Sequence, residues 1–291
     1  MTTTVAPEHT LTTIGVLGAG TMGHGIAQVF AQNGLTVVLV DNQQAQLNTA
    51  LKAVDRSLAK FVDKGKLAAD QHPATMARLH TDTDISVFAG CGLVVEAITE
   101  NEAVKIDLFR KLDSLCPAET LFASNTSAIS LTRMAAATSR PDRFMGMHFM
   151  NPVPLMNLVE LIRALQTSDA TFNAIKSLSE RLGKTPIEVR DAPGFVSNRI
   201  LMPMINEAIF TLYEGVADAD AIDSVMTLGM NHPMGPLKLA DMIGLDTCLF
   251  IMQVLYDGFK DPKYRPCPLL TQMVDAGYTG RKRGRGFYHY D

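Results

Sequence analysis

Two side chains that could exchange a proton with a ligand lie near each other in the sequence. His148 ends the apolar segment GMH, and Glu160 follows twelve residues later in LVEL. An imidazole suits general acid–base chemistry near neutral pH, and a carboxylate beside it would orient the ring and stabilise its protonated form. Taken singly, each has a simpler interpretation, His148 as a core histidine and Glu160 as a surface carboxylate. The pair predicts proton transfer only if other residues bring a ligand to it.

The segment from residue 13 to residue 41, TIGVLGAGTMGHGIAQVFAQNGLTVVLVD, predicts such a ligand. It has the pattern of a strand, a glycine turn, a helix and a second strand that ends in an acid. Gly18, Gly20 and Gly23 have the GxGxxG spacing, which permits a tight turn, leaves room for a pyrophosphate and lets the helix pack closely on the strand. Backbone N–H groups and the positive end of the helix dipole would then face the phosphates. We predict a dinucleotide site.

Asp41 indicates which dinucleotide is bound. It lies 18 residues beyond Gly23, where a carboxylate can accept hydrogen bonds from the adenosine ribose and would repel a 2′-phosphate. This favours NAD over NADP. Thr21 and Met22 belong to the same loop and are predicted to line the cofactor. A purely structural glycine turn is the alternative, and a membrane span is a further one because residues 11–40 carry no charge, although their glycines and amides argue against a span.

The composition is that of an ordinary globular protein. Of its residues, 47% are hydrophobic and 19% are charged, and its length of 291 residues is enough for two domains. A net charge of −4 without a long basic run argues against a nucleic-acid partner. The four cysteines have neither metal-site nor disulfide-framework spacing, so we expect no metal and a reducing compartment. Residues 1–12 resemble neither a signal nor a transit peptide, so we expect a loose tail on a cytoplasmic protein without membrane attachment.

The elements that would position these residues alternate between strands and helices. Strands are predicted over 93–98, 121–125 and 144–149, and a helix from shortly after Asp41 to about residue 69. Such alternation predicts an α/β fold with a Rossmann-like, doubly wound parallel sheet, in which ligands bind beyond the carboxyl ends of the strands. The polar residues expected at that edge are Asp41, Glu100, Asn125, Ser127 and His148.

The pattern changes around DAPGF, residues 191–195. Beyond it we find no convincing strand before the last residues, only amphipathic helical patterns. We therefore predict a dinucleotide-binding domain over residues 1–192 and an all-helical domain over 193–291, which would form a wall of the substrate cleft. The apolar stripe between residues 200 and 212 could face a second subunit or lie inside this domain. The basic cluster at residues 281–285 could be a solvated tail or touch a phosphate.

Short polar side chains near the expected nicotinamide could bind a substrate oxygen. Asn125 and Ser127 lie in SNTSAIS, and Asn198 lies in PGFVSNR at the domain junction. Such residues often cap helices instead. No G-x-S-x-G motif surrounds Ser127, which argues against a hydrolase nucleophile. Together with the dinucleotide loop, they suggest that His148 takes a proton from a substrate hydroxyl as hydride leaves the same carbon.

These segments identify a resemblance. GAGTMGHGIAQ, VVEAITE, SNTSAIS, GMHFMNPVPLMNLVE, PGFVSNR, HPMGPLKLAD, GLDT and GRGFYHY occur in the order seen in the 3-hydroxyacyl-CoA dehydrogenase family. The chain resembles this family from residue 13 to residue 290, and in length and layout it is most similar to the bacterial 3-hydroxybutyryl-CoA dehydrogenase branch. The resemblance implies an NAD-dependent, dimeric enzyme that interconverts a short-chain (S)-3-hydroxyacyl-CoA and the corresponding 3-oxoacyl-CoA.

The resemblance also implies roles for individual residues. His148 would be the general base paired with Glu160, and Ser127 and Asn198 would bind the 3-oxygen or position the histidine. Ser57 and Lys64 match positions that contact CoA. The residues that match cofactor positions are Gly18, Gly20, Gly23, Asp41, Glu100, Lys105, Asn151 and Lys282, to which Asn125 and Ser127 are added by their place at the sheet edge.

Two other functions stay open at this point. One is a related dehydrogenase that acts on a free hydroxy acid or sugar acid. The lysines near residue 64 favour a CoA ester as the substrate over such a free acid. The other is a nucleotide-binding protein without catalytic activity, which would have no physical need for Ser127, His148, Glu160 and Asn198 together.

Overall fold

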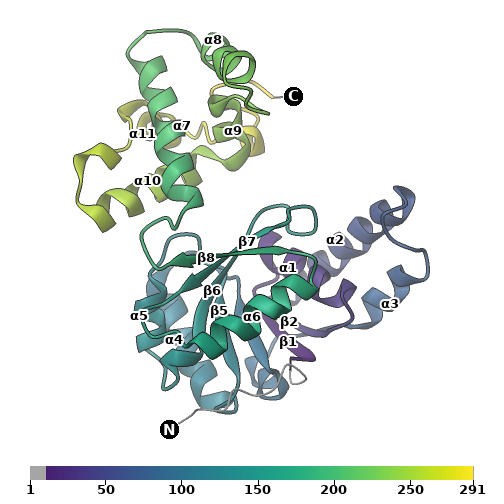
Figure 1. Ribbon diagram of the computed structural model, residues 1–291. Coiled ribbons are helices and arrows are strands. Elements are labelled where there is room, and N and C mark those ends of the chain that lie inside the picture. The colour runs from purple at the N-terminus through teal and green to yellow at the C-terminus, as the bar shows by residue number, and fades with distance from the viewer. Residues whose placement is uncertain (1–10, 291) are drawn as a thin grey trace. The chain divides into compact units, whose positions relative to one another are not determined.

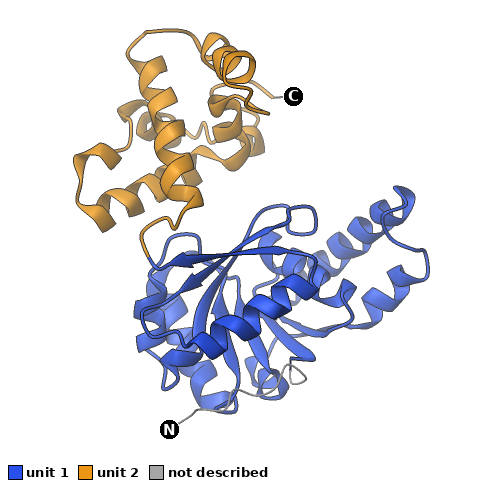
Figure 2. Ribbon diagram, viewed as in Figure 1, with its two compact units in different colours: residues 1–191 blue, residues 192–291 orange. Residues whose placement is uncertain are grey.

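The computed structural model describes residues 11–290. The chain divides into two compact units, residues 1–191 and residues 192–291 (Figure 2). Residues 1–10 of the predicted tail lie outside the described residues. The prediction of a loose tail is wrong for its last two residues, because Leu11 is buried in the core and the carbonyl of Thr12 accepts a hydrogen bond from the backbone N–H of Thr36.

The first unit is built on one eight-stranded sheet with the order β3-β2-β1-β4-β5-β6-β7-β8 (Figure 1). The strands are β1 (Thr13–Leu17), β2 (Thr36–Val40), β3 (Leu79–Asp82), β4 (Leu93–Glu96), β5 (Leu121–Ser124), β6 (Phe144–Phe149), β7 (Leu158–Arg163) and β8 (Thr185–Arg190). The predicted parallel pairing holds for β1 to β6. By contrast, β7 runs antiparallel to β6, and β8 runs parallel to β7.

Helices cover both faces of this sheet, as a doubly wound fold requires. They are α1 (Thr21–Gln32), α2 (Gln44–Asp63), α3 (Gln71–Ala77), α4 (Glu102–Leu115), α5 (Leu131–Ala136) and α6 (Asp169–Arg181). One apolar cluster joins residues of α1, α2 and α6 to the sheet. On the opposite face the ring of Phe109 in α4 lies 4.6 Å from that of Phe144 and 5.8 Å from that of Phe122. Because successive side chains of a strand point to opposite faces of the sheet, each strand contributes apolar residues to the core on both faces.

The predicted helix after Asp41 is shorter than the sequence pattern suggests. α2 ends at Asp63 instead of continuing to about residue 69. Gly65 has φ +65°, and the backbone N–H groups of Gly65 and Lys66 bond back to the carbonyls of Val62 and Phe61. A left-handed glycine with such bonds closes a helix, because it satisfies the last carbonyl groups.

The second unit is helical in its described part, as predicted, apart from two isolated β-bridges near the C-terminus. Its helices are α7 (Ser197–Tyr213), α8 (Ala219–Ser224), α9 (Pro236–Ile243), α10 (Leu245–Phe259) and α11 (Pro268–Asp275). These helices share one apolar core. The buried carboxylate of Asp241 accepts hydrogen bonds from the backbone N–H groups of Phe287 and Tyr288, at 3.0 and 2.9 Å, and so fastens the C-terminal segment to this unit.

Within residues 11–290 no single helix is long and apolar enough to cross a membrane. Helices α9 and α10 together reach the length and composition of a span, but the chain bends by 98° between them. The uncharged stretch over residues 11–40 forms β1, α1 and β2 of the sheet unit. Among the described residues no group of His, Cys, Asp or Glu side chains is arranged to hold a metal ion.

Candidate active site

The glycine loop between β1 and α1 has the shape that a bound pyrophosphate needs. Gly18 has φ +98°, and a Cβ there would lie 2.5 Å from the carbonyl oxygen of Ala97. A Cβ on Gly23 would overlap the carbonyl oxygen of Gly18, whereas a Cβ on Gly20 would meet nothing within 4 Å. No side chain caps α1 at Gly20, so its first-turn N–H groups can serve an anion. The fold thus requires glycine at positions 18 and 23, and the space beside Gly20 is open to a ligand.

Asp41 follows β2 and bonds directly to this loop. Its Oδ2 atom accepts a hydrogen bond from the backbone N–H of Ala19 at 2.9 Å, and its Oδ1 atom accepts one from that of Gln43 at 3.0 Å. Each carboxylate oxygen can accept a further hydrogen bond. Asp41 therefore holds the glycine loop in shape and can still bind a hydroxyl group. In the same loop Thr21 is exposed at the start of α1, and Met22 packs against the core.

His148 and Glu160 face each other across the antiparallel strands β6 and β7. Nδ1 of His148 lies 2.8 Å from Oε2 of Glu160. The residues are 8% and 2% exposed, respectively. Because a carboxylate accepts hydrogen bonds, Nδ1 carries the proton and donates it, so Nε2 is the ring nitrogen that can exchange a proton with a ligand. The pair lies at the carboxyl end of β6, the same sheet edge from which the glycine loop and Asp41 extend.

Asn125 connects β5 to the strand that carries His148. Its backbone N–H donates to the carbonyl of Glu96 at 2.8 Å, and its side-chain Oδ1 accepts a hydrogen bond from the backbone N–H of Phe149 at 2.9 Å. Phe149 is the residue directly after His148. The amide of Asn125 therefore fixes the backbone at the end of β6.

Glu100 organises the turn that contains Ser127. Its Oε1 atom accepts hydrogen bonds from the hydroxyl of Thr126 at 2.7 Å, from the backbone N–H of Ser127 at 2.6 Å and from the hydroxyl of Ser127 at 3.1 Å. Burial by itself would raise the pKa of Glu100, but the Lys105 ammonium and these hydrogen bonds together hold it below its ordinary value. An ionised Glu100 therefore orients both the backbone and the hydroxyl of Ser127.

Lys105 is buried, with 1% of its surface exposed, and bonds to two carboxylates. Its Nζ atom lies 3.1 Å from Oε2 of Glu100 and 2.5 Å from Oε1 of Glu96. Glu96 ends β4, is fully buried, and was not identified from the sequence. Burial raises the pKa of Glu96, and the Lys105 ammonium opposes this rise. The signal that could have identified Glu96 is an acid at the end of the otherwise apolar strand LVVE.

Asn151 is exposed in the loop between β6 and β7. Lys184, like Glu96, was not identified from the sequence. It holds this loop by donating hydrogen bonds to the carbonyls of Val153 at 2.6 Å and Met156 at 2.7 Å. Burial lowers the pKa of Lys184. Val153 also packs on α1, since a Cβ on Gly25 would lie 3.0 Å from it. The loop that joins His148 to Glu160 is therefore anchored to the helix of the glycine loop.

Ser57 and Lys64 lie on the part of the first unit formed by α2. Ser57 is half-buried on the helix, and Lys64 is exposed just after its last residue. α2 packs against α1, α3 and β3, whereas His148 belongs to β6. The fold therefore does not include these two residues in the cluster around His148.

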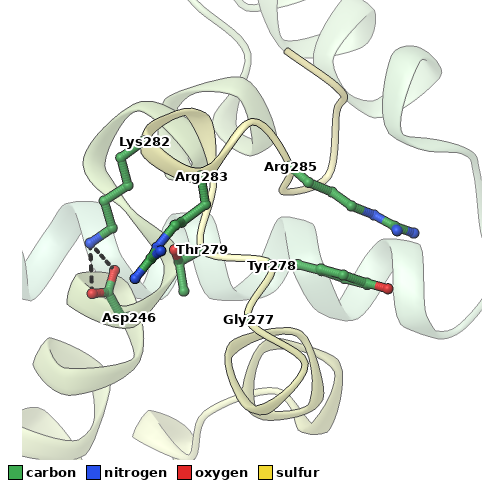
Figure 3. Close-up of a pocket in the computed structure, with 7 residues that line it drawn as sticks. All are labelled: Asp246, Gly277, Tyr278, Thr279, Lys282, Arg283 and Arg285. Carbon is green, nitrogen blue, oxygen red and sulfur yellow. Dashed lines mark hydrogen bonds and ion pairs between the residues drawn. The ribbon is translucent and has the colours of Figure 1, made fainter. Parts of the chain in front are cut away.

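Asn198 and Lys282 belong to the second unit. Asn198 is buried in the first turn of α7. The Nζ atom of Lys282 lies 2.8 and 2.7 Å from the two carboxylate oxygens of Asp246. Lys282 also lines a pocket of about 500 Å³ in this unit, in which Arg285 lies over the ring of Tyr278 (Figure 3). The pocket residues are Asp246, Gly277, Tyr278, Thr279, Lys282, Arg283 and Arg285.

Comparison with known proteins gives the same family for both units. Residues 13–192 match the family model of the 3-hydroxyacyl-CoA dehydrogenase NAD binding domain, and residues 194–290 match that of the C-terminal domain. The chain is 57% identical over 276 residues to a probable 3-hydroxybutyryl-CoA dehydrogenase of Deinococcus radiodurans, and this alignment covers 95% of this chain and 99% of that protein. It is 44% identical over 282 residues to the mitochondrial hydroxyacyl-coenzyme A dehydrogenase of Homo sapiens, over 94% of this chain and 90% of that protein.

A solved structure agrees with these relatives. The crystal structure of (S)-3-hydroxybutyryl-CoA dehydrogenase PaaH1 from Ralstonia eutropha superposes with a TM-score of 0.93 at 52% identity, covering 97% of this chain and 99% of that one. The two family models together span nearly all described residues. The chain therefore belongs to the 3-hydroxyacyl-CoA dehydrogenase family, as its motifs predict.

Proposed function

We propose that this chain interconverts a short-chain (S)-3-hydroxyacyl-CoA, such as 3-hydroxybutanoyl-CoA, and the corresponding 3-oxoacyl-CoA with NAD(H). The observation that carries the proposal is the buried His148–Glu160 pair at the sheet edge that also carries the glycine loop. A dinucleotide at the loop and a proton-transfer group at the same edge are what a hydride-transfer dehydrogenase needs. Relatives named 3-hydroxybutyryl-CoA dehydrogenase support the substrate class.

In the oxidative direction Nε2 of His148 removes the proton of the 3-hydroxyl group. When bound, NAD⁺ supplies the acceptor for the hydride that leaves the same carbon. Glu160 stabilises the resulting imidazolium through its hydrogen bond to Nδ1, which also keeps the ring in one orientation. In the reverse direction the imidazolium returns the proton to the oxygen of the 3-oxo group.

NAD fits the loop better than NADP. The backbone at Gly20 is open to a pyrophosphate, and Asp41 can accept a ribose hydrogen bond while it would repel a 2′-phosphate. No lysine or arginine occurs in residues 11–40 to neutralise such a phosphate. In this proposal the loop residues with Thr21, Met22 and Asp41 bind the cofactor, together with Glu100, Lys105, Asn125, Ser127, Asn151 and Lys282.

Substrate recognition divides between the reacting oxygen and the CoA group. Glu100 places the Ser127 hydroxyl, which can donate a hydrogen bond to the 3-oxygen when its proton turns from Glu100 to the substrate, and the side-chain N–H₂ group of Asn198 can donate in the same way. Ser57 and the exposed Lys64 on the side of α2 are assigned to CoA. An exposed ammonium at that place can pair with a phosphate without first leaving a buried ion pair.

The enzyme works as a cytoplasmic homodimer in this proposal. The second unit exposes several large apolar side chains, of which Leu228, Val216 and Ile200 have 86%, 71% and 67% of their surface accessible. Such side chains favour contact with a second copy through this unit. The four cysteines are unpaired and buried, which suits a reducing compartment.

The experiment that tests the function is an NADH-oxidation assay with acetoacetyl-CoA and, separately, free acetoacetate. We expect rapid oxidation with the CoA ester and little with the free acid. Equal efficiency with free acetoacetate would favour a dehydrogenase of free hydroxy acids. If NADH binds but no keto substrate is reduced, the chain is a nucleotide-binding protein without this activity.

A further inference from the structure

A group of three charges, of which Glu96 and Lys105 are fully buried, lies between β4 and α4. Lys105 is held between the carboxylates of Glu96 and Glu100, and Glu96 and Lys105 are 0% and 1% exposed at their side chains. Burying charges is costly, and a buried ion pair can often be replaced by apolar residues without loss of stability. The proton-transfer mechanism uses none of these atoms directly. Stability alone therefore does not explain why an ionisable side chain, and not an apolar one, occupies position 96.

We propose that Glu96 is a positioning residue that acts through Lys105 and Glu100 on Ser127. The inference rests on the proposed function, in which the Ser127 hydroxyl binds the reacting oxygen of the substrate. It adds Glu96 to that function and gives Lys105 the further role of holding Glu100.

The hydrogen-bond capacity of Lys105 supports this assignment. An ammonium has three N–H donors, and three acceptors surround Nζ: Oε1 of Glu96, Oε2 of Glu100 and, at 3.4 Å, the carbonyl of Ile98. All of these acceptors belong to the protein. Lys105 therefore links the end of β4 to Glu100, and Glu100 in turn holds the backbone and hydroxyl of Ser127.

A second path from Glu96 reaches the same turn. Its Oε2 atom accepts a hydrogen bond from the hydroxyl of Ser124 at 2.5 Å, and that hydroxyl accepts one from the backbone N–H of Thr126 at 3.1 Å. One path thus fixes Glu100 and the other fixes the turn that Glu100 binds. Both originate at a single carboxylate, so neutralising Glu96 should disturb the Ser127 turn from both sides.

The charge balance explains the direction of the effect. With Glu96 ionised, Lys105 is shared between two carboxylates, and Glu100 keeps enough negative charge to accept three hydrogen bonds from Thr126 and Ser127. Without that charge, Lys105 would be drawn to Glu100 alone and would compete with those donors. Ser127 would lose its fixed orientation while keeping its hydroxyl.

The test is a double-mutant cycle between Glu96→Gln and Ser127→Ala in the full chain. We expect Glu96→Gln to lower kcat/KM for acetoacetyl-CoA about tenfold or more, and to add less than about twofold when Ser127 is already alanine. Independent effects, in which the double variant shows the product of the two single losses, would overturn the proposal.

A matched control lies at the other end of α4. Asp113 and Arg140 form a second largely buried ion pair, at 2.7 Å, with side chains 15% and 8% exposed. Asp113→Asn should lower the melting temperature, leave kcat/KM within about twofold, and combine multiplicatively with Ser127→Ala. If Asp113→Asn reduced kcat/KM as much as Glu96→Gln, the effect would be general destabilisation and the proposal would fail.

A second variant keeps the proposal testable if Glu96→Gln does not fold. Glu96→Gln with Lys105→Met removes both charges and leaves no unpaired buried ion. It should fold and show the same non-additivity with Ser127→Ala; wild-type kcat/KM in this variant would overturn the proposal. If the wild type itself does not reduce acetoacetyl-CoA, the proposed function fails instead.

Discussion

The Glu160 carboxylate lies directly opposite the His148 imidazole in the β6–β7 ladder, with 2.8 Å between Oε2 and Nδ1. Backbone hydrogen bonds of two central strands set this relationship. The pair is therefore held by rigid elements, which suits a proton-transfer group that must keep one orientation. Because both residues are buried, removing either one breaks this hydrogen bond in a place that water reaches poorly.

Replacing His148 should remove the proton-transfer group. We expect His148→Ala to lower kcat at least about 10²-fold, while NADH binding changes little because the glycine loop is untouched. Turnover with acetoacetyl-CoA and a fluorescence titration with NADH measure the two effects on one sample. Activity within about fivefold of the wild type would remove His148 from the mechanism.

Neutralising Glu160 should weaken the histidine without removing it. In Glu160→Gln the amide oxygen can still accept the Nδ1 hydrogen bond, but the charge that stabilises the imidazolium is gone, so kcat should fall about tenfold to a hundredfold. Glu188→Gln on the neighbouring strand β8 is the control, since its side chain is 52% exposed. Equal kinetics for the two variants would contradict the pairing.

Asp41 should affect cofactor choice and cofactor affinity together. Asp41→Ala removes the repulsion of a 2′-phosphate, so the gap in kcat/KM between NADH and NADPH should narrow. It also removes the acceptor for the Ala19 N–H, so the KM for NADH should rise. Asp82→Ala, at the end of the adjacent strand β3, is a suitable control. A wild-type enzyme that prefers NADPH would show the cofactor assignment to be wrong.

Lys64 should contribute to CoA binding through an exposed charge. We expect Lys64→Ala to raise the KM for acetoacetyl-CoA from a few-fold to about tenfold at low ionic strength, with a smaller effect as salt increases. Lys52→Ala removes an exposed lysine from α2, the helix that ends directly before Lys64, and should leave KM nearly unchanged. If the two variants behave alike at low salt, CoA is held elsewhere.

The four cysteine thiols should be unreactive in the folded protein. Burial raises the pKa of Cys91 and of Cys248 to about 12, and that of Cys116 to about 11. A raised thiol pKa lowers the thiolate fraction, so at about pH 8 fewer than about one in a thousand of these groups is nucleophilic. A disulfide reagent should titrate all four cysteines after denaturation and almost none before it. Fast reaction of a native thiol would contradict this expectation.

Local patterns were sufficient for the glycine loop and for the change to helices beyond residue 192. The requirements at Gly18 and Gly23 arise within one turn and its flanking elements, and Gly20 leaves that turn open to a ligand, so spacing alone expresses this pattern. The strands β4, β5 and β6 are apolar because they are buried on both faces, and they were predicted to within two residues. The edge strands β3 and β8 were missed, since LHTD and TPIEVR are polar and lack that signal.

Contacts between distant segments could be decided only by the tertiary structure. Twelve residues of sequence do not reveal that β7 turns back along β6 and sets Glu160 opposite His148; strand direction and register do. Likewise, nothing local indicates that Lys105 on a helix is buried between Glu96 and Glu100, or that Glu100 reaches Ser127 across 27 residues. The sequence by itself determined the family and the dinucleotide loop, and it predicted His148 and Glu160 as the acid–base pair. The folded chain decided which charges are buried and paired, because burial and pairing depend on neighbours that folding supplies.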